Sequence, residues 1–144
     1  MILDTTYLLP LAGISVDVDL LRGIVEGRLP LDLSDVKVSL ISLFELQAKA
    51  AKLDIPVERV VKAVEAIERA FTVVPFTIPE IIEISFSLRK ALLKDYIDSV
   101  IVATAIALKE PLATEDEDIH AIARVIEKKY GIKIYSYSRL LHST

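Results

Sequence analysis

The chain has 144 residues, a formal net charge of −4 and no cysteine, and 53% of its residues are hydrophobic. This length and apolar content predict a single folded domain, residues 1–144, with a substantial core. The lack of cysteine excludes disulfides, thiol catalysis and zinc–thiolate sites, and the net negative charge gives no general signal for nucleic-acid binding.

The apolar stretches are too short to cross a membrane. The longest segment without charge, residues 5–16, is interrupted by Pro10 and Gly13, whereas a bilayer span needs about 20 apolar residues. The N-terminal segment has no basic region and carries Asp4, so no signal peptide is expected. We therefore expect a cytoplasmic protein without membrane contact.

Short apolar segments alternate with helical patterns along the chain. Strands are predicted at residues 1–3, 37–41, 71–76, 112–113 and 132–135. Helices are predicted at residues 5–11, 17–26, 43–53, 56–70, 79–93, 95–109, 118–130 and from 138 onward. This alternation predicts an α/β fold in which a parallel sheet is covered by helices on both faces.

Capping residues mark several of the predicted helix ends. Ser42 stands at a predicted N-cap, and Glu45 follows at the spacing of a capping box. Asp95 is the predicted N-cap of a later helix, and Gly131 is predicted to end the helix before the last strand. Glu45 therefore has a structural explanation as well as a functional one.

Four carboxylates fall where a fold of this kind binds ligands. Asp4 and Asp116 follow predicted strands, and ligands of parallel sheets bind outside the carboxyl ends of the strands. Glu45 and Asp98 fall in the first turns of two predicted helices. Converging carboxylates repel one another unless a cation lies between them, and Mg²⁺ and Mn²⁺ prefer oxygen ligands.

These acids also have purely structural explanations. Asp4 can cap the helix that follows it, and the acidic run 115–118 suits a helix N-terminus, where the dipole favours negative charge. Asp98 is harder to explain in this way, because a charge within an apolar helix needs a partner or an ion. From the residues alone, helix caps and a cation site both stay open.

The order of the acids resembles that of the PIN-domain nucleases. Four segments that extend across the chain carry the resemblance: MILDTTYLL, VSLISLFELQAKA, DYIDSVIVATAIAL and PLATEDEDI. The acids that match the family pattern in order are Asp4, Glu45, Asp98 and Asp116, and the other matching positions are Thr5, Thr114 and Asp118. Pro111 and Ile119 replace a common Gly and a common Phe, but neither change removes an acid.

The resemblance implies a three-layer α/β/α sandwich with a mostly parallel sheet and an acidic pocket at one sheet edge. It implies an endoribonuclease that hydrolyses phosphodiester bonds of single-stranded RNA with Mg²⁺ or Mn²⁺. The residues that it implies as metal ligands are Asp4, Asp98 and Asp116. Glu45 is expected to complete the site or orient the attacking water, and Thr5, Thr114 and Asp118 are expected to support it.

Other charged and titratable residues receive weaker assignments. The candidates for contacts with RNA phosphates are Lys49, Lys52, Arg89, Lys90 and Lys94. The alternative, that these are solvated cations at helix ends, is favoured from the residues alone. His120 and His142 are expected to be ordinary surface residues without a role.

Small stand-alone PIN proteins resemble the VapC toxins of toxin–antitoxin pairs, which are typically homodimers blocked by an antitoxin. A homodimer and an antitoxin partner are therefore expected, with a housekeeping RNA-processing nuclease or a non-catalytic RNA- or protein-binding scaffold as alternatives. Two other carboxylate-bearing classes fit less well. A receiver domain needs paired acids after the first strand, and a haloacid-dehalogenase-type phosphatase needs an Asp where Thr6 stands.

Overall fold

A five-stranded, entirely parallel sheet forms the centre of the protein. The computed structural model describes residues 1–142, so the last two residues of the predicted domain lie outside the described part. The strands are β1 (Ile2–Leu3), β2 (Lys37–Ser39), β3 (Thr72–Val74), β4 (Leu112–Ala113) and β5 (Ile134–Tyr135), in the order β3-β2-β1-β4-β5. Each strand lies within a predicted range, and the predicted parallel sheet is confirmed.

Helices connect the strands. They are η1 (Thr5–Ala12) and η2 (Leu33–Asp35), both of the 3-10 type, and α1 (Leu20–Val25), α2 (Leu40–Lys52), α3 (Val57–Ala70), α4 (Pro79–Ala91), α5 (Tyr96–Leu108), α6 (Glu117–Ala121), α7 (Ala123–Tyr130) and α8 (Tyr137–Leu141). No helix among residues 1–142 is long and apolar enough to cross a membrane.

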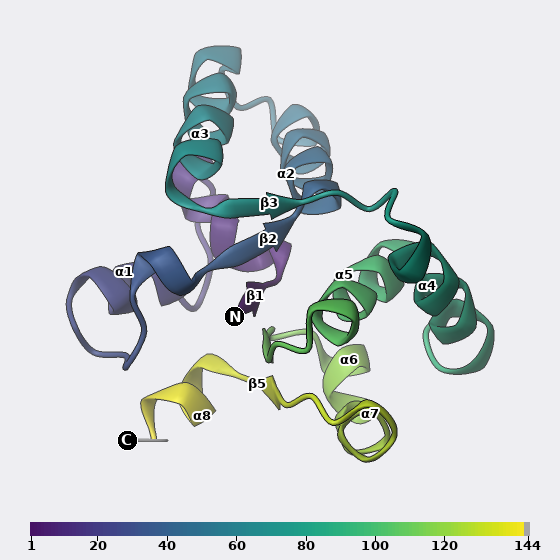
Figure 1. Ribbon diagram of the computed structural model, residues 1–144. Coiled ribbons are helices and arrows are strands. Elements are labelled where there is room, and N and C mark those ends of the chain that lie inside the picture. Colours follow the sequence, from purple (N-terminus) through teal and green to yellow (C-terminus); the bar gives the residue numbers. More distant parts are fainter. Residues whose placement is uncertain (143–144) are drawn as a thin grey trace.

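The sheet separates two apolar clusters, because successive residues of a strand point to opposite faces. Leu3 packs with η1, α1, α2, α3 and α8, whereas its neighbour Ile2 packs with α4 to α7. Ala113 and Leu112 of β4 divide in the same way. Figure 1 shows the sheet between the two sets of helices, with α1 on the left and α4 and α5 on the right. The three-layer α/β/α fold is therefore confirmed.

The predicted capping box at Ser42 and Glu45 is wrong, because helix α2 begins at Leu40. Ser39 is its N-cap, and its hydroxyl accepts a hydrogen bond of 3.2 Å from the Ile41 backbone N–H. Strand β2 pairs with β3 only as far as Ser39, so the chain is free to enter the helix earlier than the β-branched pattern suggested. Glu45 consequently lies in the second turn of α2 rather than the first.

Two further helix boundaries differ from prediction. The helix predicted at 118–130 is divided into α6 and α7 at Ile122, although Gly131 ends α7 as predicted, in the left-handed conformation at φ 76°. The helix predicted at 17–26 starts only at Leu20, because Asp19 caps it by accepting a hydrogen bond of 3.0 Å from the Arg22 N–H.

The connections of the sheet change face between the neighbouring strands β1 and β4. Two of the helices that follow β1, η1 and α1, pack on one face of the sheet, whereas α4 and α5, which lead into β4, pack on the other. In open parallel sheets, ligands bind where neighbouring strands have connections on opposite faces. The residues that directly follow β1 and β4 here are Asp4 and Thr114.

Candidate active site

Asp4 is buried at the carboxyl end of β1, with 6% of its surface exposed. Its backbone N–H donates to the Ala113 carbonyl at 3.0 Å, so the two strands stay paired up to this point. One carboxylate oxygen accepts a hydrogen bond of 2.7 Å from the Thr5 N–H, which makes Asp4 the N-cap of η1. The other accepts a hydrogen bond of 2.5 Å from the Thr114 hydroxyl.

Thr114 joins Asp4 to the turn that contains Asp116. Its hydroxyl donates to Asp4 and accepts a hydrogen bond of 3.0 Å from the Asp116 N–H. Asp116 in turn caps α6, since one of its oxygens accepts a hydrogen bond of 3.0 Å from the Ile119 N–H. Both acids therefore do cap helices, but the second oxygen of Asp116 accepts no hydrogen bond within residues 1–142.

Thr5 links the same region to α2. The buried Thr5 hydroxyl donates a hydrogen bond of 2.9 Å to the Ser42 hydroxyl oxygen, one turn before the half-buried Glu45 on that helix. The sequence interpretation assigned Ser42 to a helix cap and missed this contact. Ser42 and Glu45 are three residues apart, which places them on adjacent turns of one helical face. This spacing was the signal in the sequence that Ser42 lies on the side of the helix that carries Glu45.

Asp98 lies in the first turn of α5, as predicted. Asp95 is the N-cap of this helix and accepts a hydrogen bond of 3.0 Å from the Asp98 N–H, so that prediction is confirmed as well. The Asp98 carboxylate itself makes no hydrogen bond within the described residues. Partial burial raises the pKa of Asp98 to about 7, with repulsion from Asp116, Asp95, Asp4 and Glu45 adding to the effect.

The pKa of Asp4 is also raised, chiefly because the group is buried. Hydrogen bonds from Thr114 and Thr5 offset part of this rise, whereas repulsion from Glu45 and Asp116 adds to it. Asp4, Glu45, Asp98 and Asp116 are therefore close enough to act on one another electrostatically. Asp118 lies exposed on the first turn of α6.

The chemistry of this group fits a hard divalent cation. Carboxylate oxygens are its preferred ligands, and a cation between the acids would relieve the repulsion that, together with burial, raises the pKa values of Asp4 and Asp98. Among residues 1–142, however, no three Asp, Glu, His or Cys side chains are already arranged to hold a metal ion. The acids interact electrostatically without forming a closed ligand set.

His120 differs from the expectation of an ordinary surface residue. Its ring is half-buried, and Nε2 lies 2.7 Å from the Thr114 carbonyl oxygen. Because a carbonyl oxygen only accepts hydrogen bonds, Nε2 carries the proton in this contact. His142 is exposed, as expected.

All five predicted RNA-phosphate residues are exposed, and none forms an ion pair within residues 1–142. They lie at helix ends: Lys49 and Lys52 in the last turn of α2, Arg89 and Lys90 in the last turn of α4, and Lys94 just before α5.

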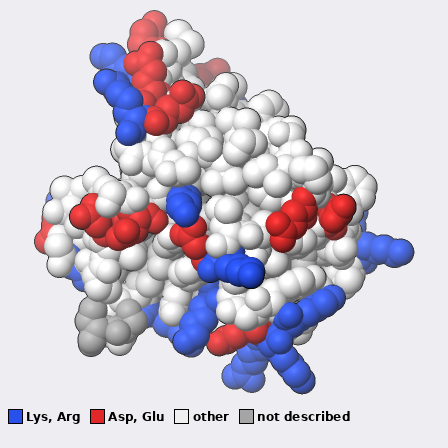
Figure 2. Space-filling view, viewed as in Figure 1, with Lys and Arg blue, Asp and Glu red and all other residues white. Residues whose placement is uncertain are grey.

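Figure 2 shows that basic side chains also gather over α7, at the lower right. The basic residues of this helix are Arg124, Lys128 and Lys129, which the sequence interpretation did not single out.

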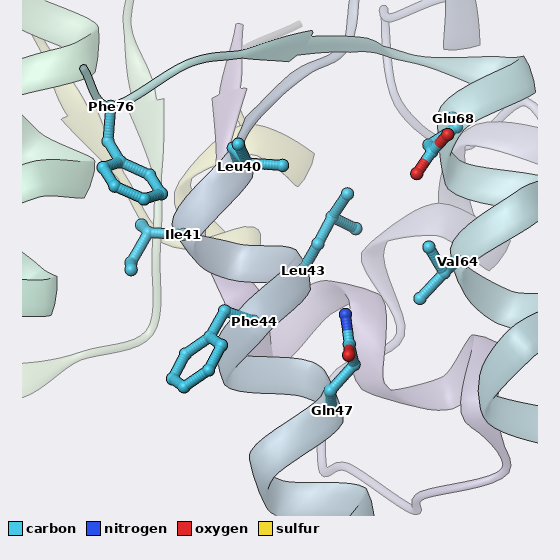
Figure 3. Close-up of a pocket in the computed structure, with 8 residues that line it drawn as sticks. All are labelled: Leu40, Ile41, Leu43, Phe44, Gln47, Val64, Glu68 and Phe76. Atoms are coloured by element: carbon cyan, nitrogen blue, oxygen red, sulfur yellow. The ribbon is translucent and has the colours of Figure 1, made fainter. Parts of the chain in front are cut away.

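An apolar groove lies between α2 and α3, apart from the four acids. Figure 3 shows Leu43 and Gln47 of α2 opposite Val64 of α3, with Glu68 above them. Other lining residues are Leu40, Ile41, Phe44 and Phe76. Phe44 of this groove is 62% exposed.

The parallel sheet and the acids after β1 and β4 define an α/β protein with an acidic site at the carboxyl edge. The PIN domain model matches residues 1–125, so the chain belongs to the PIN domain family, whose members are generally nucleases. No curated protein sequence is significantly similar to this chain.

Several solved structures share the fold. A toxin–antitoxin complex from Klebsiella pneumoniae is 22% identical over 84% of this chain and 91% of that chain, with a TM-score of 0.64. FitAcB from Neisseria gonorrhoeae is 21% identical over 97% and 100%, with a TM-score of 0.66. FitAB bound to an IR36 DNA fragment is 20% identical over the full length of both chains, with a TM-score of 0.68.

Proposed function

We propose that this protein is a divalent-metal-dependent endoribonuclease that cleaves single-stranded RNA, and that it is the toxin of a toxin–antitoxin pair of the VapC kind. The observation that carries the proposal is the mutual repulsion of four carboxylates around the carboxyl ends of β1 and β4. Such a cluster costs stability unless a cation occupies it, so its presence favours a metal-binding role over helix capping alone.

Asp4, Asp98 and Asp116 would hold the Mg²⁺ or Mn²⁺ ion, and Glu45 would orient the attacking water. When bound, the ion would lower the pKa of that water and offset the charge of the scissile phosphate. Thr114 supports the arrangement by fixing Asp4 and the Asp116 backbone at once. Thr5 supports it from the other side through Ser42 on α2, and Asp118 stays a weaker candidate on α6.

The RNA would contact basic side chains near these acids. Lys94 directly precedes Asp95, the N-cap of the helix that carries Asp98, and Arg89 and Lys90 lie one turn earlier on α4. On the other helix, Lys49 and Lys52 follow Glu45. All five are exposed and free of intramolecular ion pairs in the described part of the chain, so they are available to phosphates.

An antitoxin partner is supported by two observations. Proteins of the same fold include a toxin–antitoxin complex and the FitAB complex. The groove between α2 and α3 exposes Phe44 and Leu40, with Glu68 as its charged lining residue. An antitoxin segment with apolar side chains and a Lys or Arg would complement this groove. A homodimer is also part of the proposal, and sedimentation of the purified protein tests it.

The deciding experiment is cleavage of a labelled single-stranded RNA with Mn²⁺ or Mg²⁺. Wild type is compared with Asp98→Asn and with Asp17→Asn, an exposed acid outside the site, all purified identically. We expect wild type and Asp17→Asn to cleave, and we expect activity to be lost in Asp98→Asn and in EDTA. Equal activity in wild type and Asp98→Asn would indicate a contaminating nuclease or a wrong site. Failure of wild type both to cleave and to bind Mn²⁺ in calorimetry would favour a non-catalytic scaffold.

A further inference from the structure

Glu115, between Thr114 and Asp116, has a side chain that the proposed site does not use. Its Oε2 oxygen accepts a hydrogen bond from the Tyr7 hydroxyl and another, of 2.8 Å, from the Tyr137 backbone N–H. Tyr7 is fully buried, and Tyr137 is half-buried. Both donors converge on the same carboxylate oxygen, so the position of that oxygen is fixed from two directions.

The three residues come from three different connections at the carboxyl edge of the sheet. Tyr7 lies in η1 after β1, Glu115 lies in the turn after β4, and Tyr137 begins α8 after β5. Strands β1, β4 and β5 are neighbours in the sheet. One carboxylate oxygen therefore joins the segments that follow three adjacent strands.

The contacts of the turn alternate between the two faces of the sheet. Tyr7 and Tyr137, which hold Glu115, belong to the apolar cluster of η1, α1 and α8. Asp116 instead caps α6 through Ile119, which belongs to the opposite cluster. Glu115 is therefore held on one side of the sheet while the adjacent Asp116 is tied to a helix on the other, so the hydrogen bonds of Glu115 restrict where Asp116 can lie.

We propose that Glu115 is a positioning residue of the candidate site, which fixes the turn that carries Thr114 and Asp116 through its hydrogen bonds with Tyr7 and Tyr137. The expected effect on metal binding rests on the proposed function. The hydrogen bonds of Glu115 with Tyr7 and Tyr137 do not depend on it. The role proposed for Glu115 differs from that of Glu117 and Asp118 in the same acidic run, because those two are exposed in the first turn of α6.

A comparison of two substitutions at one position distinguishes positioning from other roles. In Glu115→Gln, the amide oxygen can replace Oε2 and accept both hydrogen bonds, whereas Glu115→Ala removes both. Glu117→Ala is the matched control, because it removes an acid of the same run, at the start of α6, that makes no hydrogen bond or ion pair within residues 1–142. Tyr7→Phe removes a single donor and keeps the ring.

The measurements are the Mn²⁺ dissociation constant by calorimetry and kcat on single-stranded RNA at saturating Mn²⁺, both well below the thermal unfolding midpoint of each variant. We expect Glu115→Ala to weaken Mn²⁺ binding about 10-fold, as loss of a residue that orients a metal ligand typically does. Tyr7→Phe should weaken it less, and Glu115→Gln and Glu117→Ala should stay close to wild type.

An unchanged dissociation constant in folded Glu115→Ala would overturn the proposal. Equal loss in Glu115→Gln and Glu115→Ala would also overturn it, by assigning the effect to the negative charge.

Amide hydrogen exchange tests the contact independently of activity. The Asp116 N–H donates to the Thr114 hydroxyl, so its exchange rate reports the order of the turn. We expect faster exchange in Glu115→Ala but not in Glu115→Gln or Glu117→Ala, and equal rates in all three would contradict the positioning role. If wild type neither binds Mn²⁺ nor cleaves RNA, the proposed function fails while this exchange measurement still decides the role of Glu115.

Discussion

The Thr114 hydroxyl donates a hydrogen bond of 2.5 Å to the buried Asp4 carboxylate, although the two residues are 110 positions apart in the chain. The contact is possible because β1 and β4 are adjacent and parallel, with Leu3 opposite Ala113. This hydrogen bond joins the two segments that carry Asp4 and Asp116, the first and last of the four acids that match the PIN family pattern. The stability of the protein and the geometry of the candidate site therefore depend on the same hydroxyl group.

Replacing this hydroxyl should lower the free energy of unfolding. In Thr114→Val, the Asp4 carboxylate and the Asp116 N–H each lose a partner, and an unsatisfied buried polar group costs about 1–3 kcal/mol. Urea unfolding at neutral pH measures the change. Thr104→Val is the matched control, because the buried Thr104 hydroxyl bonds only to the Val100 carbonyl of its own helix. A loss in Thr114→Val no larger than in Thr104→Val would contradict this account.

The partial burial of Asp98 and its repulsion from the neighbouring acids should make stability depend on pH. The pKa of Asp98 is raised to about 7 in the folded protein, so the folded state binds this proton more tightly than the unfolded state. The contribution of Asp98 to stability without metal should therefore be most favourable at and below the ordinary pKa of an Asp and should be lost as the pH rises toward about 7.

Asp98→Asn lacks this titration and should be increasingly more stable than wild type as the pH rises from about 4 to about 7. Urea unfolding in EDTA at several pH values measures the difference, with the exposed Asp17→Asn as control. Added Mn²⁺ should stabilise wild type and not Asp98→Asn. A constant difference between Asp98→Asn and wild type across this pH range would contradict a raised pKa of Asp98 in the folded protein.

At Glu110, which is separated from β4 only by Pro111, the opposite pH dependence is expected. Its carboxylate binds the Met1 amino group at 2.7 Å and also the Lys37 ammonium group. Partial burial alone would raise the pKa of Glu110, but these two hydrogen-bonded cations lower it overall. A lowered pKa stabilises the fold above the ordinary pKa of Glu, and the contribution is lost as the pH falls.

Glu110→Gln should therefore be destabilised at neutral pH, and its deficit should shrink in acid. Thermal unfolding at about pH 7 and about pH 4 measures it. Glu26→Gln should have little effect at either pH, because its ion pairs with Arg22 and Arg28 are exposed to solvent. Equal effects of the two substitutions would refute a special role for Glu110.

The exposed cations should determine how RNA binding responds to salt. Each phosphate contact with a single strand contributes a slope of about 0.7 to the dependence of log affinity on log salt. The double substitution Arg89→Gln with Lys90→Gln should weaken RNA binding and reduce this slope by up to about 1.4. Lys128→Gln with Lys129→Gln on α7 is the comparison, measured by fluorescence anisotropy over a salt series. A larger change in the α7 variant would place the RNA over that helix instead.

The sequence by itself determined the order of the five strands and of most helices, and it singled out four acids that the fold brings close enough to interact electrostatically. Apolar runs such as residues 112–113 and the cap Asp95 form patterns in which each residue interacts with near neighbours, and local patterns of this kind can be read directly. The start of α2 was misread because Ser39 and Ser42 are equally good local caps. The extent of pairing between β2 and β3 decided between them.

Only the tertiary structure decided what each acid contacts. The run 115–118 reads as four equivalent charges, yet Glu115 binds Tyr7 and Tyr137 while Asp116 caps α6 near Asp4 and Asp98. These partners are separated from the run by up to about a hundred residues and meet it only because β1, β4 and β5 are adjacent. Local chemistry specified which residues could bind a cation or a hydroxyl, and the sheet order decided which of them meet.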